Sequence, residues 1–70
     1  MFSIVWLKGG REVGREDSGL KEADDVVRYA RAKVKVVFAT FGPKAPDEFR
    51  VIDETGHEYA RQHISDDLHA

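Results

Sequence analysis

The sequence contains no cysteine, only two prolines and no long run of apolar residues. Without cysteine, disulfide bonds and cysteine-based zinc sites are excluded. No apolar run approaches the roughly 20 residues of a membrane-spanning helix, so we expect no membrane partner. The apolar N-terminal segment is short and no small-residue cleavage pattern follows it, so we interpret it as a strand and not as a signal peptide.

The chain also lacks an excess of charge of either sign. Lysine and arginine total 11 and aspartate and glutamate total 13, giving a net charge of −2. Domains that bind duplex nucleic acid are usually clearly basic, so this balance argues against that function. The 70 residues predict one domain with a small core, which has to gain its stability from a well-packed helix on a sheet or from self-association.

Apolar residues recur at three- and four-residue spacing through the middle of the chain. They predict one long amphipathic helix from Leu20 to Phe41, which Gly42 and Pro43 end. Residues 34–41 are also rich in β-branched side chains, so a strand is the alternative there. The apolar residues of the predicted helix face are Leu20, Ala23, Val27, Ala30, Val34, Val37 and Phe41.

Two hairpins are predicted on either side of this helix. The first joins a strand over Phe2–Leu7 to a return strand over residues 11–15 through Gly9 and Gly10, because tight two-residue turns need positive φ angles. The second joins Phe49–Asp53 to His57–Arg61 through an Asp-Glu-Thr-Gly turn. The implied pairs are Lys8 with Arg11, Trp6 with Val13, Val51 with Tyr59, and Phe49 with Arg61.

The element order therefore predicts an α+β fold (ββαββ), with the long helix packed on a small antiparallel sheet. We expect a single domain over residues 1–64 and a disordered C-terminal tail over residues 65–70. The predicted core consists of Phe2, Ile4, Trp6, Val13, Leu20, Val27, Ala30, Val34, Val37, Phe41, Phe49, Val51 and Tyr59.

Some apolar residues remain outside this core and favour an interface with a second copy of the chain or with another protein. They are Val5, Leu7, Tyr29, Val36 and Ile52. The alternative is a nucleic-acid-binding or regulatory module that uses basic residues on the first hairpin and one helix flank. Those residues are Lys8, Arg11, Arg15, Arg28, Arg31 and Lys35.

No pattern in the sequence indicates catalysis, a metal or a cofactor. His57, His63 and His69 are six residues apart, which fits neither one helix face nor a zinc motif. The paired acidic residues lie at expected helix starts, turns or the tail, and none accompanies a nucleophile motif. We therefore expect a non-catalytic protein without a catalytic, metal or cofactor site.

The order of motifs resembles short bacterial proteins of unknown function. The likeness rests on a first strand ending in Gly9-Gly10, on Ala30-Arg31 within the helix, and on Val51-Ile52-Asp53-Glu54-Thr55-Gly56 as a hairpin. The resemblance implies a cytoplasmic helix-plus-sheet domain with no assigned activity. The resulting hypothesis is a small module that associates with itself or with another protein.

Overall fold

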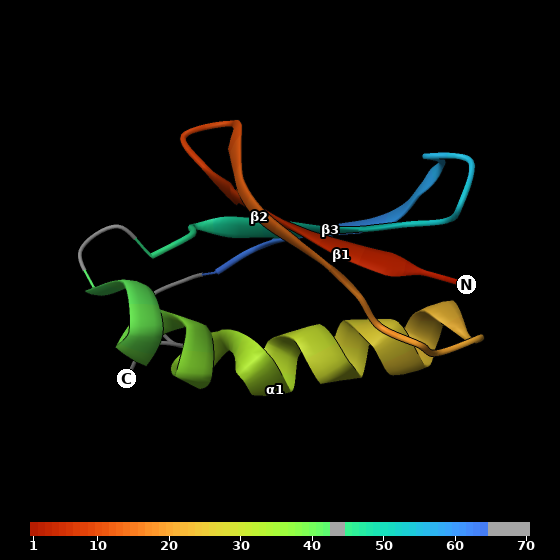
Figure 1. Ribbon diagram of the computed structural model, residues 1–70, viewed down its shortest axis with the longest axis horizontal. Coiled ribbons are helices and arrows are strands. Elements are labelled where there is room, and N and C mark those ends of the chain that lie inside the picture. Colours follow the sequence, from red (N-terminus) through yellow and green to blue (C-terminus); the bar gives the residue numbers. More distant parts are fainter. Residues whose placement is uncertain (43–44, 65–70) are drawn as a thin grey trace.

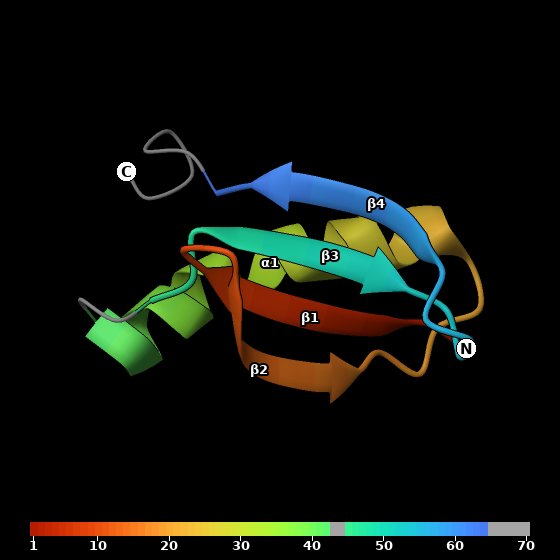
Figure 2. The same cartoon turned by 90° about the horizontal axis from the view of Figure 1, so that it is seen from above.

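The computed structural model describes residues 1–42 and 45–64 and contains one helix on one face of a four-stranded antiparallel sheet (Figures 1 and 2). The strand order across the sheet is β2-β1-β3-β4. The predicted element order and antiparallel sheet are confirmed, and residues 34–41 belong to the helix and not to a strand. The elements are β1 (Ser3–Lys8), β2 (Arg11–Asp17), α1 (Ala23–Phe41), β3 (Glu48–Ile52) and β4 (Glu58–His63).

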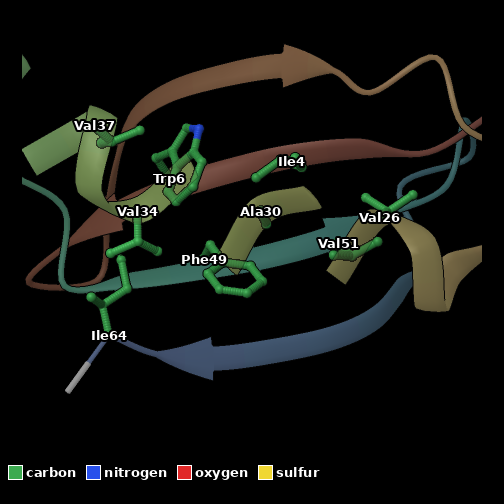
Figure 3. Close-up of a cluster of buried hydrophobic side chains, with 9 residues drawn as sticks. All are labelled: Ile4, Trp6, Val26, Ala30, Val34, Val37, Phe49, Val51 and Ile64. Atoms are coloured by element: carbon green, nitrogen blue, oxygen red, sulfur yellow. The ribbon is translucent and has the colours of Figure 1, made fainter. Parts of the chain in front are cut away.

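The main core lies between α1 and the sheet (Figure 3). The helix contributes Val26 and Ala30, both fully buried, whereas Val27 is only partly buried. The prediction that Val27 belongs to the buried face of the helix was therefore wrong in detail. The helix α1 is rotated about its axis so that Val26 faces the sheet more directly than Val27. The buried cluster is Ile4, Trp6, Val26, Ala30, Val34, Val37, Phe49, Val51 and Ile64.

The helix begins at Ala23 and not at Leu20. Leu20 still packs against the core from the segment before the helix, beside the partly buried Phe2. Asp17 and Ser18 accept backbone hydrogen bonds within this segment, from Gly19 and Leu20. Their side chains therefore fix the connection between β2 and α1 and do not cap the helix.

A β-bulge in the first hairpin moves Val13 out of the predicted core. Lys8 pairs with Arg11 as expected, but the register shifts between Trp6 and Leu7, so that Trp6 lies opposite Gly14. The residue added by the bulge is Val13, whose exposed fraction is 42%. Counting alternate residues outward from the turn could not reveal this shift. One extra residue in β2 moves every later side chain of that strand to the opposite face of the sheet.

The second hairpin contains a similar bulge, and it displaces Tyr59. Val51 pairs with Ala60, not with Tyr59, and Phe49 pairs with Gln62, not with Arg61. Tyr59 is 56% exposed. Its ring makes a T-shaped contact with the ring of Phe2, which lies at the periphery of the core, with 4.9 Å between the ring centroids.

The remaining predictions about the core concern the C-terminal half. Ala45, Pro46 and Ile64 are buried, although sequence analysis placed none of them in the core. The side chain of Phe41, predicted to be buried, and the predicted tail over residues 65–70 lie outside the part of the structure that is described.

Candidate functional site: the open face of the sheet

The sheet face opposite α1 has no described segment over it, and we call it the open face (Figure 2). Val5, Leu7 and Ile52 form an apolar cluster there, separate from the core under the helix. Their exposed fractions are only 1%, 6% and 6%, so the surface around them is formed by other side chains. Both hairpin turns bend away from α1 toward this side of the sheet (Figure 1).

Strand register arranges the open face in three rows, because directly opposite residues on neighbouring strands point to the same side. The middle row carries three arginines and is flanked on both sides by rows that contain carboxylates. From β2 to β4 the rows are Glu12, Leu7, Glu48 and His63; then Arg15, Val5, Arg50 and Arg61; then Asp17, Ser3, Ile52 and Glu58.

Glu58 links the two arginines at the β3–β4 end of the middle row. Its Oε1 accepts hydrogen bonds from Nε of Arg50 and from Nε and Nη2 of Arg61, the latter at 3.2 and 3.1 Å. The hydrogen bonds from Arg50 and then from Arg61 hold the pKa of Glu58 below its ordinary value. This carboxylate therefore fixes both guanidinium groups in place on the surface.

Three further charged residues of the open face are also in ion pairs. Arg15 donates to Glu12 at 3.0 Å, and Glu48 lies 3.9 Å from Nη1 of Arg61. Among residues 1–42 and 45–64, Glu48 is the only charged residue that is buried. Fixed ion pairs of this kind give the face a defined charge pattern and not a uniform potential.

The structure separates the five predicted interface residues. Val5, Leu7 and Ile52 come together on the open face, whereas Tyr29 and Val36 lie on α1, on the other side of the sheet. Val36 is 61% exposed. Tyr29 is partly buried and belongs to a polar cluster that ties the helix to β2.

That cluster is centred on Glu16, which the register places on the helix side, opposite Ile4. Its carboxylate accepts hydrogen bonds from Trp6 Nε1 at 3.1 Å, from Lys33 Nζ at 2.8 Å and from the Tyr29 hydroxyl at 3.3 Å. Partial burial by itself would raise the pKa of Glu16, but the hydrogen bonds from Lys33 and Trp6 outweigh it and lower the pKa. These contacts orient the helix on the sheet.

The six basic residues predicted for nucleic-acid binding do not form one surface. Lys8 and Arg11 flank the β1–β2 turn and Arg15 lies on the open face, whereas the other three lie on α1 with the sheet between the two groups (Figure 1). Those three, all exposed, are Arg28, Arg31 and Lys35.

Among residues 1–42 and 45–64 there is no pocket and no group of three or more side chains suited to hold a metal ion. His57 is exposed beside Tyr59, with ring centroids 5.3 Å apart, and His63 lies 3.8 Å from Glu48. His69 lies outside the described residues. Within the described part of the chain, α1 is not apolar enough to cross a membrane.

Sequence reasoning missed Arg50, Arg61 and Glu58 as members of the candidate site. The predicted core leaves out Arg50 and Glu58, but the predicted register pairs Arg61 with the core residue Phe49. The bulge beside Tyr59 transfers Arg61 to the open face, opposite Arg50.

Comparison of the chain with protein-family models, curated proteins and solved structures found no match. The resemblance to short bacterial proteins of unknown function stays a prediction from the residues.

Proposed function

We propose that the chain is a small protein-interaction module that acts by binding and not by catalysis, and that the open face is its binding surface. One observation carries the proposal: an apolar cluster and an ordered set of arginines and carboxylates share a face that no described segment covers. Fixed charges on a face select a complementary partner and orient its approach. A cytoplasmic location, which the resemblance implies, is part of the proposal.

The burial of the apolar cluster defines how such a surface would work. Val5 is 1% exposed in the isolated chain, so a partner first meets the charged side chains around it. Binding should then depend on ionic strength, because exposed charges are screened over about 8 Å at physiological salt. The apolar cluster is already buried, so it supports the flanking side chains and adds little apolar area to the contact itself.

Site-specific photo-crosslinking tests the proposal. A benzophenone amino acid in place of Ser3 puts the probe on the open face, and one in place of Ala32 puts a matched probe on the exposed side of α1. We expect covalent adducts with protein from the Ser3 position at several-fold higher yield, in the cells that naturally produce the chain. Equal yields from both positions, or no adduct from Ser3, would contradict the proposal.

A second candidate function, nucleic-acid binding, is favoured by one observation on the helix. Arg28, Arg31 and Lys35 are exposed along one side of α1, and none of them forms an ion pair with another described residue, not even Arg28 with Asp24 one turn earlier. Phosphate contacts from such residues weaken steeply with salt. Retardation of labelled RNA or DNA that Arg31→Ala weakens, with a salt slope reduced by about one, would support this function.

A further inference from the structure

Three aromatic rings meet at the end of the sheet where the chain turns from β3 into β4. The ring of Tyr59 makes T-shaped contacts with the rings of Phe2 and His57, with 4.9 and 5.3 Å between the ring centroids. Tyr59 and His57 are exposed, whereas Phe2 is partly buried and packs against the core. We call these three residues the aromatic corner. Its two exposed rings rest on a side chain that the fold holds in place.

The β-bulge of the second hairpin brings Tyr59 to this corner. Val51, which would lie opposite Tyr59 in a regular hairpin, pairs with Ala60 instead, so that Tyr59 has no partner on β3. Bulges commonly re-aim a side chain beside a functional site. Here the result is a tyrosine with more than half of its surface open to solvent.

The end of the molecule that contains the aromatic corner is acidic. Both the β3–β4 turn and the first turn of α1 lie at this end (Figure 1). The basic groups there are Lys21 and the α-amino group of Met1, which donates to Glu54 at 2.7 Å. Charges summed over a surface attract ions of the opposite sign, so this end attracts a cation. The acidic residues are Glu22, Asp24, Asp25, Asp53 and Glu54.

One of these carboxylates is fixed beside the aromatic corner. Asp53 accepts hydrogen bonds from the hydroxyl of Thr55 at 2.6 Å and from the backbone N–H groups of Thr55 and His57, both at 2.9 Å. The hydrogen bond from the Thr55 hydroxyl is the main reason why the pKa of Asp53 lies below its ordinary value. The bond to the backbone of His57 ties this negative charge to the aromatic corner.

The chain already combines a ring, a carboxylate and an ammonium group at another place. Nζ of Lys33 lies 5.2 Å from the centroid of the Tyr29 ring and donates a hydrogen bond to Glu16 at 2.8 Å. Cations are attracted to the faces of aromatic rings in this way. The aromatic corner offers the ring of Tyr59 and the carboxylate of Asp53, but within residues 1–42 and 45–64 no lysine or arginine lies over its rings.

We propose that the aromatic corner binds an arginine side chain of another protein, with the guanidinium group over the exposed ring of Tyr59 and close to the acidic turn. Arginine fits this site better than lysine, because its planar guanidinium group stacks on an aromatic ring and donates paired hydrogen bonds to a carboxylate. The site lies at one end of the sheet and not on the open face. It therefore goes beyond the proposed function and does not depend on it.

An NMR titration of the ¹⁵N-labelled chain with the peptide acetyl-Gly-Arg-Gly-Arg-Gly-amide tests the inference. We expect saturable shifts of the amide signals of His57 and Tyr59. The same peptide with citrulline in place of arginine is neutral and nearly identical in shape, and it should cause no shifts. A peptide with lysine in place of arginine should bind more weakly, because it has the charge without the planar group.

Two variants of Tyr59 separate the ring from its apolar bulk. Tyr59→Leu should weaken binding of the arginine peptide about fivefold, as expected for the loss of a cation over an exposed ring, whereas Tyr59→Phe should bind like the parent. The control is Val36→Ala, a change at an exposed apolar residue of α1, which should also bind like the parent. Circular dichroism checks that each variant is folded.

Several results would overturn the inference. They are the absence of shifts with the arginine peptide, equal shifts with the citrulline peptide, shifts confined to other parts of the chain, and a folded Tyr59→Leu variant that binds like the parent. Equal affinity for the arginine and lysine peptides would overturn the assignment to arginine. None of these results affects the open face, which the crosslinking from Ser3 tests separately.

Discussion

Arg50 and Arg61 lie directly opposite each other on β3 and β4, and both donate hydrogen bonds to Oε1 of Glu58. Like charges at opposite positions of a sheet destabilise it, so this pair depends on the carboxylate between them. We predict that Glu58→Gln lowers the thermal midpoint of unfolding, and that the loss is smaller in an Arg61→Ala background. Equal losses in the two backgrounds would contradict the dependence.

The contact between Glu16 and Lys33 predicts a second effect on stability. Glu16→Gln should reduce the free energy of unfolding by about 1 kcal/mol, because it removes the ion pair from a partly exposed cluster while keeping most of the hydrogen-bonding capacity. Urea unfolding measures the change. Tyr29→Phe removes only the longest of the three hydrogen bonds to Glu16 and should cost less; a larger loss from Tyr29→Phe would contradict the assignment.

The same ion pair predicts how stability depends on pH. The pKa of Glu16 lies below its ordinary value of 4.5 in the folded chain, so its contribution is complete above pH 4.5 and disappears as pH falls through the folded pKa. The pKa of Lys33 lies above its ordinary value of 10.5, chiefly because Lys33 donates to Glu16. Its contribution is therefore complete below pH 10.5 and is lost as pH rises through the folded pKa.

Glu16→Gln should consequently flatten the stability profile at both ends. Thermal unfolding from pH 3 to pH 11 measures it, with the parent chain as reference. A variant whose loss of stability is the same at every pH would show that the charge of Glu16 does not act through Lys33.

Two glycines of the first hairpin should respond to alanine in opposite ways. Gly14 lies opposite Trp6, and an added Cβ would have its nearest neighbour, Cδ1 of Trp6, at an ordinary contact distance of 3.7 Å. Gly14→Ala should therefore stabilise the chain by about 0.5 kcal/mol, because it restricts the unfolded chain. Gly10 has a φ of +82°, which alanine rarely adopts, so Gly10→Ala should destabilise it. Chemical unfolding of both variants checks the difference in sign.

The positions of Leu7 and Val36 predict that only one of them affects association. Leu7 lies in the apolar cluster of the open face, whereas Val36 is exposed on α1. Val36→Lys should associate like the parent, although the sequence indicated Val36 as an interface residue. Leu7→Lys should prevent association, and because Leu7 is buried its folding has to be checked by circular dichroism. Loss of association in Val36→Lys would move the interface to the helix.

Sequence patterns predicted the elements of this fold better than the pairing of its strands. The helix was predicted through Val34–Phe41 because apolar spacing and the Gly42 stop agree there, and both act within one segment. The errors at Val13 and Tyr59 have one cause, since each hairpin contains a bulge that alternation from the turn cannot reveal. The burial of Val26 in place of Val27 depends on the roll of α1, which is determined by packing against the sheet and by contacts with Glu16.

The candidate site was only partly predictable for the same reason. Val5, Leu7 and Ile52 were predicted as interface residues outside the core, and the structure brings these three into one cluster. The row of Arg15, Arg50 and Arg61 depends on the registers of three strand pairs, two of which contain bulges. No local pattern in the sequence carries that information.

The most direct test of self-association through the open face is an NMR dilution series of the ¹⁵N-labelled chain at low salt. We predict that amide signals of open-face residues such as Val5, Arg15 and Arg50 shift with concentration, and that those of Arg28 and Arg31 on α1 do not. Raising the salt concentration should reverse the shifts. Shifts confined to α1, or signals that are independent of concentration up to the millimolar range, would contradict self-association through this face.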